Sequence, residues 1–435
     1  MSNKPSLSTI SRLTSLNRFI LSNPLTNALL VNRPTNPSTT PTSKATMSSA
    51  RQLTFIPGPI EFSDAVLQAM STPSQAHTSP EFIATFQEAL KNTRKLFKST
   101  DANAQGFVLN GSGTLGWDIV GANFLNANEK ALVLSTGFFS DSLAEALRVY
   151  TDKVDIIEAP GFGQTVEFHK IAAQLSEAKS AGAPYKLITI TQTDTSSGVL
   201  SDVKGISEIV KKTSPETLIV VDAVCATACE PLEFDAWGID YVLTASQKAV
   251  GVPSGLSISF ASGRAIAKAL AKEKPVAFYS SLKKWLPIMK AYESGAGAYF
   301  ATPAIQLVTA YNVSLKQELL ASGSIDERIQ AHKVASDAFK DKIEALGLKL
   351  VPVSRDVAAH GLSVIYYPEG VNAGDLLSKI REKGFTMATG IYKEYKTKYF
   401  RVGHMGVAAV GERKKELDLA SNAIKDSLAE LGYKK

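Results

Sequence analysis

Cysteine is scarce in this chain: Cys225 and Cys229 are the only two in 435 residues. Two thiols in one short segment cannot form a disulfide framework, which favours a reducing compartment over secretion. Their Cys-x3-Cys spacing is not accompanied by a histidine pair at metal-ligand spacing. We therefore expect two buried thiols and no metal site.

Long hydrophobic runs are also missing. A membrane-spanning helix needs about 20 consecutive apolar residues, and no segment reaches that length. Overall, 44% of the residues are hydrophobic and 20% are charged, which is ordinary for a soluble globular enzyme. The composition predicts no membrane partner.

Acidic residues are absent from residues 1–60, and Glu61 is the first of them. Without the six basic residues of that stretch, the 47 basic residues of the chain fall to 41, which equals the 41 acidic ones. The net charge of +6 therefore belongs to the N-terminus. Phosphate binding needs clustered Lys and Arg, so we expect no nucleic acid as a partner of the folded body. The six basic residues are Lys4, Arg12, Arg18, Arg33, Lys44 and Arg51.

Residues 1–50 form a segment of their own, rich in Ser, Thr, Asn, Arg and Pro. Within it, Ile10 to Leu30 has the pattern of a basic amphipathic helix, which is typical of a mitochondrial transit peptide. A disordered tail without an address is the alternative. A start at Met47 would yield a shorter, cytoplasmic form.

Beyond residue 50, short apolar segments alternate with amphipathic ones. This alternation predicts a large α/β domain with a mostly parallel sheet over residues 51–314. The expected strands are Gly106–Leu109, Ala131–Ser135, Val154–Glu158, Leu187–Thr191, Leu218–Val221, Tyr241–Ala245 and Leu256–Phe260. The expected helices between them include Ser140–Tyr150, Glu167–Ala181 and Lys204–Thr213.

From residue 315 the pattern changes, and residues 315–435 are predicted to form a smaller α+β domain. Its expected helices are Ser324–Leu346, Ala373–Lys383 and Gly411–Leu431. Its expected strands are Leu348–Pro352, Ser363–Tyr367 and Tyr399–Val402.

The segment from Gly111 to Gly116 matches Gly-x-Gly-x-x-Gly between an expected strand and an expected helix. In a dinucleotide-binding fold the next strand ends in an acidic residue, whereas here Ala131–Ser135 is followed by Thr-Gly-Phe-Phe. A nicotinamide cofactor is therefore disfavoured. The loop still suits a single phosphate at a helix N-terminus, and a tight turn without a ligand is the alternative. Trp117, just after the loop, is expected in the core.

Two expected strands end in unusual groups. Asp222 closes Leu218–Val221, and Lys248 lies just past Tyr241–Ala245. If these strands are neighbours, the carboxylate and the amine open into one crevice. An ion pair at the rim of a sheet is one interpretation of the pair. The other is pyridoxal phosphate (PLP) chemistry, in which a lysine holds the cofactor as a Schiff base and a carboxylate keeps its pyridine nitrogen protonated.

A set of motifs in a fixed order favours the second interpretation. From about Leu53 to the C-terminus, the chain resembles the alanine–glyoxylate and serine–pyruvate aminotransferases, the fungal alanine–glyoxylate enzymes above all. They belong to class V of the fold-type-I PLP enzymes. The matching segments are Phe55–Ile60, Asn110–Asp118, Asp194–Val199, Val221–Val224, Thr244–Ala249, Ala298–Pro303 and Arg401–Gly406.

The resemblance implies a fold-type-I architecture, with a mostly parallel seven-stranded sheet in the large domain. It also implies a role for individual residues. Lys248 would hold PLP and later move the substrate proton, Asp222 would pair with the pyridine nitrogen, and Arg401 would bind the substrate carboxylate. Gly58 would offer the substrate a backbone contact. The further cofactor contacts would be Ser112, Gly113, Thr114 and Gln247 at the phosphate, Phe139 stacked on the ring, and Thr195 at the ring hydroxyl.

Tyr299 and Thr302 would reach the cofactor phosphate of a second subunit, so the resemblance implies a homodimer with shared sites. One departure is Thr114, since human-like members carry His there. No element for a second substrate carboxylate is evident, which suits small neutral amino acids.

The implied activity is transfer of the amino group of L-alanine to glyoxylate, giving pyruvate and glycine by a ping-pong mechanism. Serine–pyruvate or serine–glyoxylate transamination is an alternative. An inactive binding protein with the same fold is another, although the joint presence of Lys248, Asp222 and Arg401 disfavours it. Cysteine desulfuration is disfavoured because no cysteine follows Cys229.

Overall fold

The structure is a computed structural model and describes residues 51–435. The expected transit peptide or tail over residues 1–50 lies outside the described residues. Within the described part, no helix is long and apolar enough to cross a membrane.

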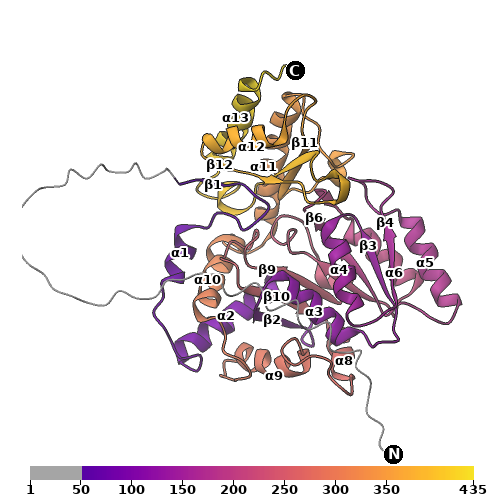
Figure 1. Ribbon diagram of the computed structural model, residues 1–435. Coiled ribbons are helices and arrows are strands. Elements are labelled where there is room, and N and C mark those ends of the chain that lie inside the picture. The colour runs from indigo at the N-terminus through magenta and orange to yellow at the C-terminus, as the bar shows by residue number, and fades with distance from the viewer. Residues whose placement is uncertain (1–50) are drawn as a thin grey trace, which may run out of the picture. The chain divides into compact units, whose positions relative to one another are not determined.

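The central element is a seven-stranded sheet in the order β2-β10-β9-β8-β5-β3-β4 (Figure 1). Strand β10 is antiparallel to both of its neighbours, and the other pairs are parallel. This confirms the predicted mostly parallel sheet. All of its strands except β4 are almost fully buried, as expected when helices cover both faces. The strands are β2 (Gln105–Asn110), β3 (Ala131–Ser135), β4 (Val154–Glu158), β5 (Leu187–Thr191), β8 (Leu218–Asp222), β9 (Tyr241–Ala245) and β10 (Leu256–Ala261).

Crossover helices cover the two faces of this sheet, as the right-handed rule for connections between parallel strands predicts. The connections β2–α3–β3 and β3–α4–β4 run toward the β4 edge, whereas those through α5, α6 and α7 run back. Accordingly, α3 packs against α4, and α5 packs against α6. These helices are α3 (Gly113–Phe124), α4 (Phe138–Arg148), α5 (Phe168–Ser180), α6 (Val203–Thr213) and α7 (Phe234–Trp237). A short hairpin of β6 (Thr193–Asp194) and β7 (Val199–Leu200) follows β5.

Helices that the sequence analysis did not predict surround the β2 edge (Figure 1). Helix α2 packs against α9 and α10, and α10 also packs against α1. Ser63 and Ser79 cap the first two, each accepting a backbone hydrogen bond in the first turn. The helices are α1 (Asp64–Met70), α2 (Pro80–Leu96), α8 (Gly263–Leu270), α9 (Leu282–Glu293) and α10 (Ile305–Ser314), which continues as a π-helical turn, Leu315–Leu319.

The C-terminal part has a three-stranded antiparallel sheet in the order β11-β14-β13, with three helices. The N-terminal strand β1 (Leu53–Thr54) pairs with β12 (Phe385–Thr386) in this part. The predicted strand Leu348–Pro352 is wrong, because only Leu350 forms an isolated bridge, and Pro352 has no N–H to continue a ladder. The elements are α11 (Asp326–Ala345), β11 (Leu362–Tyr366), α12 (Ala373–Glu382), β13 (Ala388–Thr389), β14 (Tyr399–Gly403) and α13 (Lys415–Glu430).

Two buried hydrophobic clusters underlie this arrangement. One is built mainly from the seven-stranded sheet and its helices, and the other from α11 to α13, β11 and β14, together with Phe55. The described residues 51–435 nevertheless belong to one compact unit, so the predicted boundary between residues 314 and 315 stays a prediction.

Candidate active site

The carboxyl ends of the parallel strands bring the predicted residues to one edge of the sheet. Asp222 is the last residue of β8, and Lys248 follows β9 by three residues. Strands β8 and β9 are hydrogen-bonded neighbours, with Asp222 in register with Leu243. The condition set by the sequence, that the two strands lie side by side, is therefore met.

The protein donates one hydrogen bond to each oxygen of the Asp222 carboxylate. The residue is only 4% exposed. One oxygen accepts a hydrogen bond of 3.0 Å from the backbone N–H of Val224, and the other accepts one of 2.7 Å from the indole N–H of Trp117. Burial raises the pKa of the Asp222 carboxyl to about 6, and the two hydrogen bonds oppose that rise.

Trp117 thus belongs to the site as well as to the core. Its place in the buried cluster agrees with the sequence analysis, but its contact with Asp222 was missed. A helix beginning at Gly113 places residue 117 one turn later on the face above the sheet, so helical spacing was the available signal.

The Lys248 amine is held by the segment that precedes α1. Its Nζ donates a hydrogen bond of 2.6 Å to the carbonyl oxygen of Pro57. Gly58 has φ +122°, and a Cβ there would lie 2.5 Å from Cδ and 2.8 Å from Nζ of Lys248. The backbone N–H of Ile60 also donates to the carbonyl of Gln247. Only glycine allows the chain to pass this close to the lysine.

The glycine-rich loop lies at the start of α3, next to the end of β8. Gly113 is buried, and a Cβ there would lie 3.0 Å from Val224. The flanking Ser112 and Thr114 are exposed, and Ser112 is the N-cap residue. Free backbone N–H groups at the start of a twelve-residue helix, together with two hydroxyls, form a site that suits an anion.

Asp194 organises the strand end between Asp222 and α4, although no role was predicted for it. This fully buried carboxylate accepts hydrogen bonds from the backbone N–H groups of Phe139 and Ser140, both 3.1 Å, and from Ser196. It therefore fixes the first turn of α4, which carries the half-buried Phe139, to the hairpin that carries Thr195. An acid close to the end of a buried strand, as at Asp222, was the signal that could have found it.

Two side chains in the site have buried atoms without a hydrogen-bond partner. The hydroxyl of Thr195 and the Oε1 of Gln247 make no hydrogen bond within the described residues. Leaving such a group unpaired costs about 1–3 kcal/mol. These atoms are therefore candidates for contacts with a bound molecule.

Arg401 comes from the small C-terminal sheet and reaches the same edge. It lies in β14, is 9% exposed, and donates to the carbonyl oxygens of Thr389 at 2.8 Å and Thr195 at 3.5 Å. No carboxylate of the described residues forms an ion pair with it. A buried guanidinium held only by carbonyls can bind a carboxylate through its planar fork.

Tyr299 and Thr302 lie apart from these buried groups. Tyr299 is 62% exposed and Thr302 is exposed as well. The side-chain amide of Asn110 anchors this segment, donating 2.7 Å to the Thr302 carbonyl and accepting from Ala304. The segment is thereby tied to the end of β2, just before the glycine-rich loop.

The site thus contains a lysine, a buried carboxylate, a helix terminus that suits an anion, and a buried guanidinium bonded to two carbonyls. The class V aminotransferase family profile matches residues 61–392. The chain belongs to the class V aminotransferases. Its fold is that of the fold-type-I members of this group, as the sequence resemblance implied.

Similar proteins of known sequence are consistent with this family. The chain is 47% identical to alanine–glyoxylate aminotransferase 1 of Saccharomyces cerevisiae over 373 residues, which are 83% of this chain and 94% of the yeast protein. It is 28% identical to L-aspartate–glyoxylate aminotransferase of Paracoccus denitrificans, covering 81% of this chain and 86% of that protein. It is 25% identical to serine–glyoxylate aminotransferase of Arabidopsis thaliana, covering 81% and 85%.

Solved structures share the fold of this class V aminotransferase. The alanine–glyoxylate aminotransferase of Nostoc sp. superposes with a TM-score of 0.78 at 23% identity, covering 92% of this chain and all (100%) of that one. The pyridoxamine–pyruvate aminotransferase of Mesorhizobium loti has a TM-score of 0.80 at 21% identity, with coverages of 89% and 94%. At these identities the similarity to the solved structures shows only the fold.

Proposed function

We propose that this class V aminotransferase transfers the amino group of L-alanine to glyoxylate, with PLP held by Lys248. The observation that carries the proposal is the placement of Lys248, Asp222 and the buried Arg401 at one strand edge, in a chain 47% identical to the yeast alanine–glyoxylate enzyme. The products are pyruvate in one half-reaction and glycine in the other.

The residues at the strand edge fit PLP. The start of α3, with Ser112, Gly113 and Thr114, suits the phosphate, and the side-chain amide of Gln247 can turn its NH2 group toward the phosphate. The unpaired Thr195 hydroxyl suits a polar group of the cofactor. Phe139 offers a ring face for stacking. Asp222, which keeps lone pairs on both oxygens, is the acceptor for the protonated pyridine nitrogen.

When bound, PLP supplies an electron sink for the charge that develops at the substrate α-carbon. The chain supplies the rest. Arg401 binds the α-carboxylate and so orients the Cα–H bond, which can lower the barrier by several kcal/mol. Lys248 would take the proton from the α-carbon, and Asp222 would supply the negative charge that keeps the ring nitrogen protonated. The Pro57 carbonyl positions the lysine amine before substrate binds.

Serine is the alternative amino donor. Serine–glyoxylate aminotransferases are among the similar proteins, but at identities of 25–28%. We give alanine priority because of the 47% identity with the yeast enzyme.

Two further parts of the proposal concern assembly and location. Tyr299 and Thr302 are exposed beside Asn110, which supports a role at the site of a second subunit in a homodimer. The composition of residues 1–50 supports a mitochondrial address, and initiation at Met47 would give a cytoplasmic form.

The deciding experiment is an absorption spectrum of the full-length protein with PLP, followed in one cuvette by alanine and then glyoxylate. We expect a visible band that alanine removes and glyoxylate restores, which reports both half-reactions. A band that serine removes and alanine leaves unchanged would show that serine is the amino donor. Folded protein that acquires no band with PLP would overturn the function.

The assignment of Lys248 is tested by Lys248→Ala, which should bind PLP without a covalent link. Borohydride should then fix no cofactor to the chain. The matched control is Lys272→Ala, which removes another partly buried amine that donates to backbone carbonyls. Cofactor that is still fixed to the Lys248→Ala protein would contradict the assignment.

A further inference from the structure

A cavity behind the β6–β7 hairpin lies outside the proposed active site and has no role in the proposed reaction. Its volume is about 460 Å³, within the range of about 300–1,000 Å³ that is typical of small-molecule sites. It is formed by the end of β5, the start of α6, the segment before α5, Trp237 of α7, and Asp356 with Val357. Neither Lys248, Asp222 nor Arg401 lines it.

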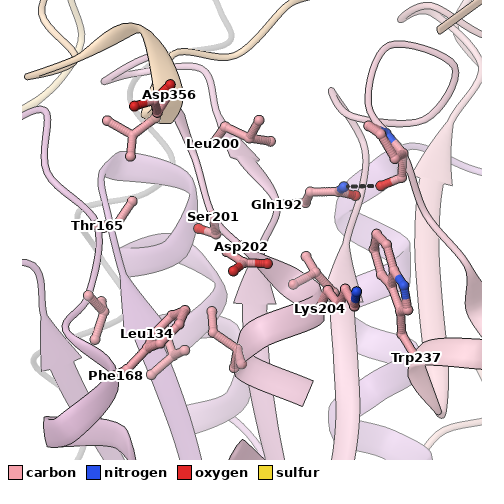
Figure 2. A pocket seen from close by; sticks show the side chains of 15 residues that line it. Leu134, Thr165, Phe168, Gln192, Leu200, Ser201, Asp202, Lys204, Trp237 and Asp356 are labelled. Atoms are coloured by element: carbon pink, nitrogen blue, oxygen red, sulfur yellow. Dashed lines mark hydrogen bonds between the residues drawn. The ribbon is translucent and has the colours of Figure 1, made fainter. Parts of the chain in front are cut away.

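The lining of this cavity is mainly apolar and partly aromatic. Figure 2 shows Phe168, Leu134 and Trp237 around the same space as Gln192. Other apolar walls are Val166, Leu200, Val203, Ile206 and Pro231. Such a surface favours a flat hydrophobic molecule. The charged side chains that line it, Asp202, Asp356 and Lys204, are exposed and of both signs, so they select neither an anion nor a cation.

Gln192 supplies the polar group that such a molecule would meet. Its side chain is buried, with 3% exposure of the residue. The amide nitrogen donates 2.8 Å to the carbonyl of Pro231, drawn as the dashed line in Figure 2, and this bond fixes which end of the amide is oxygen. Within residues 51–435 the Oε1 has no hydrogen-bond partner. An unpaired buried acceptor at an apolar cavity is a site for a donor.

We propose that this cavity binds a small planar aromatic molecule whose N–H donates to Oε1 of Gln192. Indole has these properties, because its bicyclic ring is apolar and its only polar group is one N–H donor. It serves as the probe for the chemical class.

Backbone hydrogen bonds connect the cavity to the proposed cofactor site. The N–H of Gln192 donates 2.9 Å to the carbonyl of Asp222, and its own carbonyl accepts from Ser201. The hairpin between them carries Asp194 and Thr195 on its way to Ser201. We therefore expect a molecule that contacts Gln192 to be coupled to Asp222 through these bonds, and this coupling rests on the proposed function.

The binding test compares indole with benzofuran, which has the same shape but no donor, by calorimetry on the full-length protein. We expect indole to bind with a Kd on the order of 1 mM or tighter. Benzofuran should bind about fivefold more weakly, as expected for one neutral hydrogen bond. In Gln192→Met the two ligands should bind equally, since the Pro231 residue is exposed and its carbonyl can turn to water. Equal affinities in the wild-type protein would overturn the proposal.

A second variant tests the location. Leu200→Trp fills the cavity and should abolish binding of both ligands, whereas Val371→Trp, in a separate cavity near the C-terminus, should leave it unchanged. Indole binding that survives Leu200→Trp would place the ligand elsewhere and overturn the assignment.

Coupling is tested by the Kd for PLP with and without saturating indole, where we expect a change of at least about twofold. An unchanged Kd would overturn the coupling. A chain that binds indole but has no transaminase activity would overturn the proposed function and leave the cavity assignment standing. An active transaminase that fails to bind indole would overturn the cavity assignment and leave the proposed function standing.

Discussion

The indole N–H of Trp117 donates a 2.7 Å hydrogen bond to the carboxylate of Asp222. The other carboxylate oxygen is held by the N–H of Val224. The carboxylate is thus fixed in orientation before any cofactor arrives, and two donors stabilise its charge against burial. Trp117 is a positioning residue for Asp222.

Trp117→Phe is predicted to weaken PLP binding by about tenfold, since a hydrogen bond to a charged group contributes about 1.5–3 kcal/mol. Loss of the donor raises the pKa of Asp222 further above its present value of about 6, so more of the carboxyl is protonated at neutral pH. The affinity of the variant for PLP should therefore recover as pH rises, relative to wild type. Fluorescence titration between pH 6 and about 9 measures this shift.

The matched control is Trp285→Phe, the same change in a buried tryptophan of α9 whose indole N–H donates to the carbonyl of Tyr279. Its PLP affinity should follow the wild-type pH profile. If Trp117→Phe shows that profile too, Trp117 does not act through Asp222.

Gly58→Ala is predicted to displace Lys248 and prevent covalent loading with PLP. The added Cβ would lie 2.5 Å from the lysine Cδ, at a φ of +122° that alanine rarely adopts. Mass spectrometry after borohydride reduction measures the loaded fraction. Gly182→Ala is the control, because it also has positive φ but nothing within 4 Å of the new Cβ. Full loading of Gly58→Ala would show that the lysine does not need this close passage.

Arg401→Lys is predicted to raise KM for both alanine and glyoxylate by about tenfold or more. The ammonium keeps the charge but loses the planar, bidentate fork. The effect should fall on KM and kcat/KM, while the visible band without substrate stays as in wild type. Arg355→Lys, an exchange at a surface cluster with Asp341 and Glu344, serves as the control. An unchanged KM would show that Arg401 does not bind the substrate carboxylate.

Lys340 gives a pH dependence of stability. The residue is 2% exposed, and its amine donates to Ser336 and to the Ala359 carbonyl. Burial lowers its pKa from 10.5 to about 8. Between these two values the unfolded chain binds a proton that the folded chain does not, so stability rises with pH through this window and levels off below pH 8.

Relative to Lys340→Met, wild type should therefore gain up to about 1.4 kcal/mol per pH unit above pH 8. Denaturant unfolding at several pH values measures the difference. Lys342→Met, an exposed position on the same helix, should show a constant difference. A constant difference for Lys340→Met would mean that its amine keeps its proton when buried.

Several features of this protein followed from the sequence alone. The strands around Asp222 and Lys248 were predictable because short β-branched runs buried on both faces leave a strong local pattern. The helix after the glycine-rich loop and the absence of an acid after β3 were equally local. The ordered motifs indicated the family, which the family profile confirmed.

Tertiary structure decided the contacts between segments distant in the chain. The approach of Pro57 and Gly58 to Lys248 joins positions about 190 residues apart, and the meeting of Arg401 with Thr195 joins positions 206 apart. The Trp117–Asp222 bond and the capping of α4 by Asp194 likewise depend on strand order. Periodicity reports which face of a segment is buried, because the repeat of a helix or strand places regularly spaced apolar side chains on one face. It does not report the partner across the fold, because that depends on how the crossovers place each strand.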